Sequence, residues 1–97
     1  MKVSELKDGL RRLDVEAKII EKEETRTVNL RAGGTANVCD FTIQDETGSI
    51  KLSLWDDMIE QVKVGDKVKV ENGYTNSFRG DVRVNVGRYG KLEVINE

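Results

Sequence analysis

Apolar and polar residues alternate along most of this chain, a pattern typical of strands that bury one face. The first such stretch begins at Leu13, and its apolar members lie two residues apart. Successive side chains of a strand point to opposite faces of a sheet, so this spacing predicts one buried face and one solvated face. Residues 25–31 continue in an extended pattern, and we expect one long first strand that is bent or bulged near residues 23–25. Its apolar members are Leu13, Val15, Ala17, Ile19, Val28 and Leu30.

The same alternation predicts four further strands, separated by polar or glycine-containing turns. Gly73 could introduce a bulge near the end of the fourth strand, because glycine inside a strand often marks one. The predicted strands cover residues 39–44, 48–55, 67–74 and 82–87, and the turns cover residues 31–35, 45–48, 76–81 and 88–90.

Two segments break the alternation and predict short helices or turns. Residues 3–12 could form an N-terminal helix or turn, with Ser4 as a cap and Gly9 as a stop. Residues 56–62 predict a short helix that Asp56 would cap. The apolar side of this second helix would consist of Met58, Ile59 and Val62.

This order of elements predicts an all-β fold. A five-stranded antiparallel Greek-key β-barrel, with a short helix between strands three and four, is the oligonucleotide/oligosaccharide-binding (OB) fold. An SH3-like barrel and a split β-sandwich are the alternatives. A long first strand favours the OB fold, because that strand serves both halves of the barrel. We expect a single domain over residues 1–97, with residues 1–12 as an N-terminal segment that leads into the barrel.

The composition argues against an enzyme. The chain contains no histidine, no Cys/His pair and no P-loop. The adjacent acids Asp45/Glu46 and Asp56/Asp57 are explained by turn and cap positions, so we expect no metal, no cofactor and no small-molecule substrate. Cys39, the one cysteine, is predicted to be a buried strand thiol. A reducing, cytoplasmic location is expected, and no apolar run suits a membrane span.

Trp55, the only tryptophan, does not follow the phase of the apolar residues beside it. Leu52 and Leu54 share one face of the predicted third strand, whereas Trp55 shares the other face with Lys51 and Ser53. A flat ring on a solvated strand face is suited to stacking an unpaired base. The alternative is that Trp55 turns inward at the end of the strand and fills the core.

Two other aromatic residues and a local excess of positive charge support a binding surface. Phe78 lies in a polar turn beside an arginine. Tyr74 would point inward in an undisturbed strand and outward if a bulge intervenes. Although the formal net charge is −2, residues 72–92 carry four basic residues against one acid, Asp81. These four are Arg79, Arg83, Arg88 and Lys91.

Residues 45–57 (DETGSIKLSLWDD) and 62–87 (VKVGDKVKVENGYTNSFRGDVRVNVG) resemble the archaeal OB-fold single-stranded DNA-binding proteins and the DNA-binding modules of replication protein A. The opening VSELKDGLRRLDVEAKIIE is also similar to the start of those modules. The resemblance implies stacking roles for Trp55, Tyr74 and Phe78, a basic contact from Arg79 and a strand-five role for Asn85. It also implies that Tyr74 is turned outward by a bulge.

The sequence therefore predicts sequence-tolerant binding of single-stranded DNA in replication, recombination or repair, in a nucleoid-associated protein. An RNA-binding OB module and a protein-interaction OB domain are the alternatives. Partners would be single-stranded DNA or RNA, and replication or repair proteins. The predicted binding residues are Trp55, Tyr74, Phe78, Arg79, Lys51, Arg83, Asn85 and Arg88, with Lys69, Arg26 and Arg31 as weaker candidates.

Overall fold

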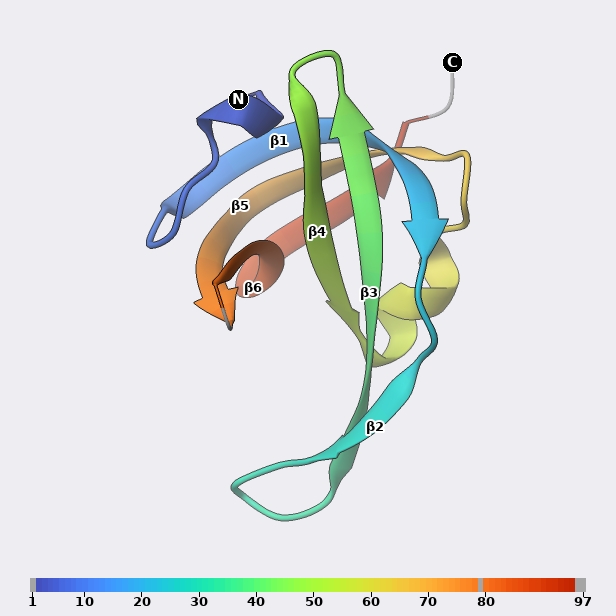
Figure 1. Ribbon diagram of the computed structural model, residues 1–97. Coiled ribbons are helices and arrows are strands. Elements are labelled where there is room, and N and C mark those ends of the chain that lie inside the picture. Colours follow the sequence, from blue (N-terminus) through green and yellow to red (C-terminus); the bar gives the residue numbers. More distant parts are fainter. Residues whose placement is uncertain (1, 79, 96–97) are drawn as a thin grey trace.

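The computed structural model describes residues 2–78 and 80–95, apart from the side chains at positions 78 and 87–89. Six strands and two short 3-10 helices, η1 and η2, make up the fold (Figure 1). Their bounds are η1 Val3–Glu5, β1 Arg11–Lys22, β2 Arg26–Asn29, β3 Thr35–Asp45, β4 Gly48–Trp55, η2 Asp56–Gln61, β5 Lys67–Phe78 and β6 Asp81–Val94.

The strands pair in the order β1-β5-β6-β4-β3-β2, and a further β1–β3 pairing closes the sheet into a barrel. The β4–β6 pair is parallel and the other pairs are antiparallel. Both β1 and β2 lie along the same edge of β3, at its two ends, so together they form the long first strand of a five-stranded barrel. The break between them, at residues 23–25, confirms the predicted bend. The OB fold is confirmed as well.

The β2–β3 hairpin extends beyond the barrel as an arm, at the bottom of Figure 1. Within this arm, β2 pairs with the first residues of β3, from Thr35 to Val38. The opposite end of β3 pairs with β1. The arm is therefore connected to the barrel by the continuous strand β3 and by the contact of Arg26 on β2 with Asp40 on β3.

The predicted alternation of β1 is realised in the packing. Leu13, Val15, Ala17 and Ile19 are buried, and the residues between them are exposed. Phe41 and Cys39 are fully buried in the barrel core, as the sequence predicted. Among the described residues, no helix is long and apolar enough to cross a membrane.

The predicted N-terminal helix or turn is shorter than expected, because η1 ends at Glu5, a turn follows at residues 8–9, and β1 already begins at Arg11. Ser4 does not cap it: the N–H of Ser4 lies inside η1 and donates to Thr47 Oγ1 at 3.0 Å. The N–H of Val3 donates to Asp45 Oδ2 at 2.8 Å, which places the Val3 side chain in the core. The turn between β3 and β4 therefore anchors the start of the chain.

Asp56 is not the cap of the second helix, and this prediction was wrong. It is the first residue of η2, with a left-handed φ of 48°, and its Oδ1 accepts the N–H of Asn37 at 3.0 Å. The helix is a 3-10 helix, and its predicted apolar side is confirmed because Ile59 and Val62 are buried while Met58 packs against the core.

The predicted turn at residues 88–90 was also wrong, since β6 continues through it to Val94. Opposite this stretch, β6 leaves the regular ladder. Val86 pairs with Gly73, and the next pair is Lys91 with Glu71, so residues 87–90 face Asn72 alone. The extra residues bulge out of the ladder without reversing the chain. The predicted turn at 76–81 is shorter than expected, because β5 extends to Phe78.

Candidate nucleic-acid interface

Trp55 lies on the outer face of the barrel, as its phase predicted, and its side chain is 41% exposed. Its cross-strand neighbour on β3 is Val38, and the neighbour of Val38 on β2 is Arg26. Residues paired across strands share a face of the sheet. The ring, an aliphatic side chain and a guanidinium group therefore form one row that runs from the barrel to the hairpin arm.

Tyr74 is exposed on the same outer face, with 40% of its surface accessible. It pairs with Asn85 on β6, which in turn pairs with Ser53 on β4, two residues before Trp55. The register of β5 shifts between Glu71 and Gly73, which confirms the predicted bulge and the outward ring.

The bulge residue itself is Asn72, with a left-handed φ of 54°. Asparagine tolerates this conformation better than most residues. The backbone N–H of Asn72 donates to Asp14 Oδ1 at 3.0 Å, so the bulge is hydrogen-bonded to β1. Gly73 matters for a different reason: a Cβ there would lie 2.8 Å from the carbonyl oxygen of Asn85 and 2.8 Å from Val70 Cγ1.

A groove of about 320 Å³ lies beside Trp55 on this face. Its lining combines apolar side chains of β2 and β3, the hydroxyl and indole groups of β4, the amide groups of β5 and β6, and guanidinium groups of β2 and β6. Such a mixture suits a planar, partly polar ligand. The lining residues are Arg26, Val28, Val38, Ser53, Trp55, Asn76, Arg83 and Asn85.

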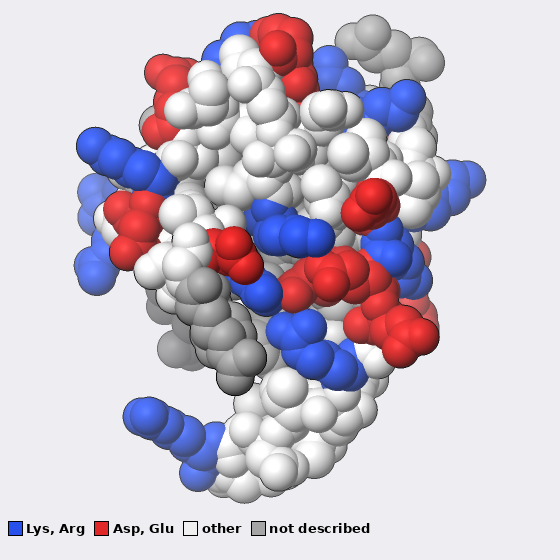
Figure 2. All heavy atoms as spheres, in the orientation of Figure 1, with Lys and Arg blue, Asp and Glu red and all other residues white. Residues whose placement is uncertain are grey.

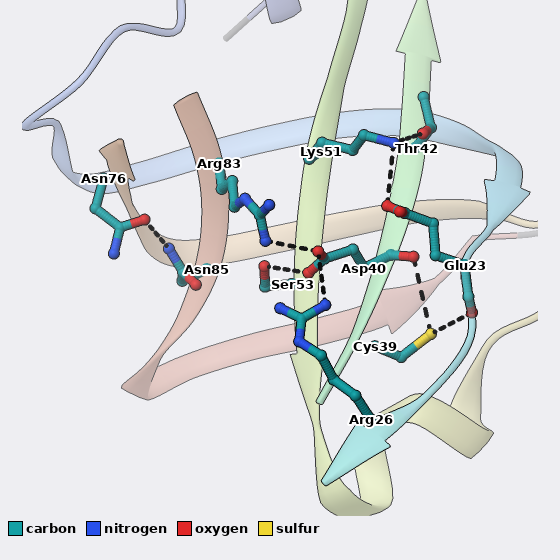
Figure 3. A network of polar contacts seen from close by, with 10 residues as sticks. All are labelled: Glu23, Arg26, Cys39, Asp40, Thr42, Lys51, Ser53, Asn76, Arg83 and Asn85. Carbon is teal, nitrogen blue, oxygen red and sulfur yellow. Dashed lines mark hydrogen bonds and ion pairs between the residues drawn. The ribbon is translucent and has the colours of Figure 1, made fainter. Parts of the chain in front are cut away.

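A buried carboxylate, Asp40, organises the charges at this groove (Figure 3). It is 2% exposed. The Ser53 hydroxyl donates to Oδ1 at 2.8 Å, and the Nη1 atoms of Arg26 and Arg83 lie 3.2 and 2.6 Å from Oδ2. Burial by itself would raise the pKa of Asp40. The hydrogen bonds from Ser53 and Arg26 and the positive charges of both arginines outweigh it and lower the pKa.

The two asparagines of the groove are joined to each other. Asn85, 7% exposed, donates through Nδ2 to Oδ1 of Asn76 at 3.0 Å. Asn76 lies beside Arg83 in the register of β5 and β6. Asn85, for which the family resemblance implied a role, therefore lies at the groove, and its hydrogen bond to Asn76 fixes the orientation of its amide.

Lys51 is already engaged by an acid on this face. Its Nζ lies 3.1 Å from Glu23 Oε2 and donates to Thr42 Oγ1 at 3.1 Å. Figure 2 shows basic and acidic side chains adjoining one another across the middle of this view. The face is thus charge-mixed, and the arginines bound to Asp40 give it a local excess of positive charge.

Arg31 is exposed in the turn between β2 and β3 and is not among the residues that line the groove. The other remaining residues divide into two groups. The side chains of Phe78 and Arg88, and the whole of Arg79, lie outside the described part of the chain. Lys69 forms an ion pair with Glu71 at 3.3 Å and is not among the residues that line the groove.

Sequence reasoning missed Asp40, Ser53 and Asn76 as parts of the site and gave Arg26 too little weight. No local signal marks Asp40, which alternates with core residues like any solvated strand acid. It is buried because arginines from 14 and 43 positions away cover it. Only the fold brings these groups together.

Comparison with known proteins finds relatives over almost the whole chain. The chain is 32% identical over 96 residues to the single-stranded DNA-binding protein Ssb of Saccharolobus solfataricus, covering 99% of this chain and 64% of that protein. It is 30% identical to replication factor A of Methanothermobacter thermautotrophicus, covering 99% of this chain and 13% of that one. The chain thus spans about two thirds of the first relative and a small part of the second.

Solved structures share the fold. The second OB-fold domain of replication protein A from Methanococcus maripaludis superposes with a TM-score of 0.81 at 23% identity, covering 100% of this chain and 95% of that domain. The replication factor A related protein of Methanobacterium thermoautotrophicum gives a TM-score of 0.82 at 19% identity, covering 99% of this chain and 90% of that one.

Residues 9–94 match the family of Ssb-like single-stranded DNA-binding proteins with an OB fold. The match confirms the resemblance seen in the sequence. It also confirms the prediction that the chain is not an enzyme, because the family is non-enzymatic. The chain therefore belongs to the Ssb-like OB-fold family.

Proposed function

We propose that this domain binds single-stranded DNA with little sequence preference, by stacking bases on Trp55 and Tyr74 and placing the sugar-phosphate backbone beside Arg26 and Arg83. Family membership supports the ligand class. A module of this kind would serve DNA replication, recombination or repair. Phe78, Arg79 and Arg88 remain sequence-based predictions of further contacts.

One observation carries the proposal: Trp55 and Tyr74 are both exposed on the same face of the barrel. The strands that hold them, β4 and β5, are separated only by β6 and so lie about 10 Å apart. Trp55 lies two residues along β4 from the row that pairs Ser53, Asn85 and Tyr74, and two rings placed in this way on one face can hold two unpaired bases of one strand. A stacked base contributes about 1–3 kcal/mol whatever its identity, which gives affinity without sequence preference.

The charges around the groove suit a phosphate backbone. Arg26 and Arg83 share the single carboxylate of Asp40, so the cluster keeps one net positive charge. Counterion release on phosphate contact then favours binding at low salt. The apolar lining at Val28 and Val38 can accommodate a base or sugar edge beside the ring of Trp55.

The test is a titration of the protein with an oligothymidine strand while its intrinsic fluorescence is followed. Because Trp55 is the only tryptophan, quenching of selectively excited tryptophan emission reports on this ring alone. We expect saturable quenching by the single strand at low salt and weaker binding of duplex DNA of equal length, whose bases are already stacked. Absence of quenching at low salt would contradict the proposal.

A parallel titration with an RNA strand of matched sequence distinguishes the nucleic acid. Equal or tighter binding of RNA would indicate an RNA-binding module that uses 2′-hydroxyl contacts. Tighter binding of DNA is the expected result. An absence of binding to both strands would favour a protein-interaction domain.

A further inference from the structure

We propose that Asp40 is a positioning residue of the nucleic-acid site, which holds the guanidinium groups of Arg26 and Arg83 side by side for phosphate contact. This inference rests on the proposed function. Asp40 is 2% exposed and is therefore not a ligand-contacting group itself. Its effect on binding would be exerted through the two arginines.

The contacts of Asp40 come from three different strands. Ser53 on β4 fixes Oδ1, while Arg26 on β2 and Arg83 on β6 meet at Oδ2. Arg26 belongs to the hairpin arm, and its ion pair with Asp40 crosses from that arm to the barrel (Figure 3). The same carboxylate thus sets the position of the arm relative to β6 and orients both guanidinium planes.

The Arg26 side chain is 50% exposed, so it remains accessible while it contacts Asp40. A guanidinium group carries five N–H donors in a rigid fork that matches a phosphate. Fixing this fork in advance lowers the entropy that binding must otherwise remove. A rigid supporting contact of this kind is what a binding site needs behind the groups that touch the ligand.

This role predicts an effect opposite in sign to that of simple charge. Asp40 is an acid beside a polyanion site, so its removal should strengthen DNA binding if only net charge matters. If Asp40 positions the arginines, its removal should weaken binding even though the protein becomes more positive. Whether DNA affinity rises or falls on removal of Asp40 therefore distinguishes a net-charge effect from a positioning role.

The experiment compares Asp40→Asn with Glu23→Gln, using anisotropy of a labelled oligothymidine. Both changes remove one negative charge from an acid that pairs with a basic side chain at this face. Glu23 is partly exposed and pairs with Lys51 alone among the described ion pairs, so it is a matched control. We expect Asp40→Asn to weaken binding about tenfold and Glu23→Gln to leave it equal or tighter.

Three further measurements complete the test. Thermal unfolding verifies that both variants are folded at the titration temperature. In a double-mutant cycle, Asp40→Asn should cost less affinity in an Arg26→Gln background, because one of its two targets is already gone. Asp40→Glu keeps the charge and should restore part of the lost affinity.

If Asp40→Asn does not fold, substitutions of Arg26, the exposed partner of Asp40, provide the test. Arg26→Lys keeps the charge but lacks the fork, and we expect it to lose at least half of the binding free energy that Arg26→Gln loses. Arg26→Lys binding as tightly as the wild type would overturn the inference. So would a folded Asp40→Asn protein that binds as tightly as Glu23→Gln. A wild-type protein that binds no oligonucleotide would instead overturn the proposed function.

Discussion

Tyr74 lies on the same face of the barrel as Trp55 because β5 bulges at Asn72. Before the bulge, Val68 and Val70 point into the core at even spacing. After it the phase is reversed, so that Tyr74 is exposed although it follows Val70 by an even number of residues. The left-handed conformation of Asn72 thus determines that the Tyr74 ring points to the surface and not into the core.

Removal of either ring should weaken binding with little effect on the fold. We expect Trp55→Ala and Tyr74→Ala each to reduce affinity for oligothymidine by about 1–3 kcal/mol, because each loses one stacked base. Both residues are partly exposed and neither belongs to the core cluster, so we expect the free energy of unfolding to fall by less than truncation of a core side chain would cost. Anisotropy of a labelled strand measures binding in both variants.

Val64→Ala is the matched control for these two substitutions. Val64 is an exposed apolar residue, 53% accessible, in the segment between η2 and β5 and outside the groove. We expect wild-type affinity from it. An equal loss of affinity in Val64→Ala would show that the effect is not specific to the rings.

Substitution of Gly73 should disturb both the fold and the site. A Cβ at this position would lie 2.8 Å from the Asn85 carbonyl oxygen, a backbone atom that cannot move freely. We expect Gly73→Ala to lower the free energy of unfolding by about 1–3 kcal/mol. It should also weaken binding, because the clash displaces the strand that carries Tyr74. Urea unfolding and oligonucleotide titration measure the two effects.

Asn72 offers a matched pair of variants for the bulge. Asn72→Gly should be more stable than Asn72→Val, since glycine adopts a left-handed φ without a steric penalty. Asn72→Val should destabilise the protein by about 1–2 kcal/mol, because a β-branched residue is strained there. Equal stability of the two variants would argue against a left-handed bulge at this position.

Salt should weaken binding in proportion to the phosphates contacted. With about three contacts, the slope of log K against log salt should lie near −2, using about −0.7 per phosphate of a single strand. Arg26→Gln should make the slope shallower by about 0.7, since one contact is lost. Titrations at several salt concentrations give both slopes, and an unchanged slope would remove Arg26 from the backbone contacts.

Asp45 anchors the N-terminal segment through the N–H of Val3, and its ionisation should make the free energy of unfolding depend on pH. Burial alone would raise the pKa of Asp45, but hydrogen bonds from the Thr47 hydroxyl and from the N–H groups of Val3, Thr47 and Gly48 lower it to about 2. A carboxyl whose pKa is lowered on folding stabilises the native state above its unfolded pKa of 3.8. This contribution is lost as the pH falls from about 4 to about 2.

Urea unfolding at a series of pH values tests this dependence. Asp45→Asn should be less stable than the wild type near pH 6, and the difference between the two proteins should shrink below about pH 4. A difference that stays constant down to pH 2 would show that the charge of Asp45 does not stabilise the fold.

Local sequence determined the strands, most of the core and the orientation of Trp55. Alternation is a local property, so the buried positions of β1 and the exposed ring of β4 could be read without a structure. The prediction of an outward Tyr74 needed more, namely a resemblance to a family, because spacing alone left both directions open.

The tertiary structure decided which charged groups form the site. Asp40, Arg26 and Arg83 lie on β3, β2 and β6, and β6 reaches this face only through its non-local pairing with β4. Their burial and pairing leave no trace in the local pattern. The sequence predicted that Lys51 contacts phosphate, whereas in the structure Lys51 forms an ion pair with Glu23. The periodicity of a chain fixes which way each side chain points, whereas charge pairing depends on distances between strands far apart in the sequence.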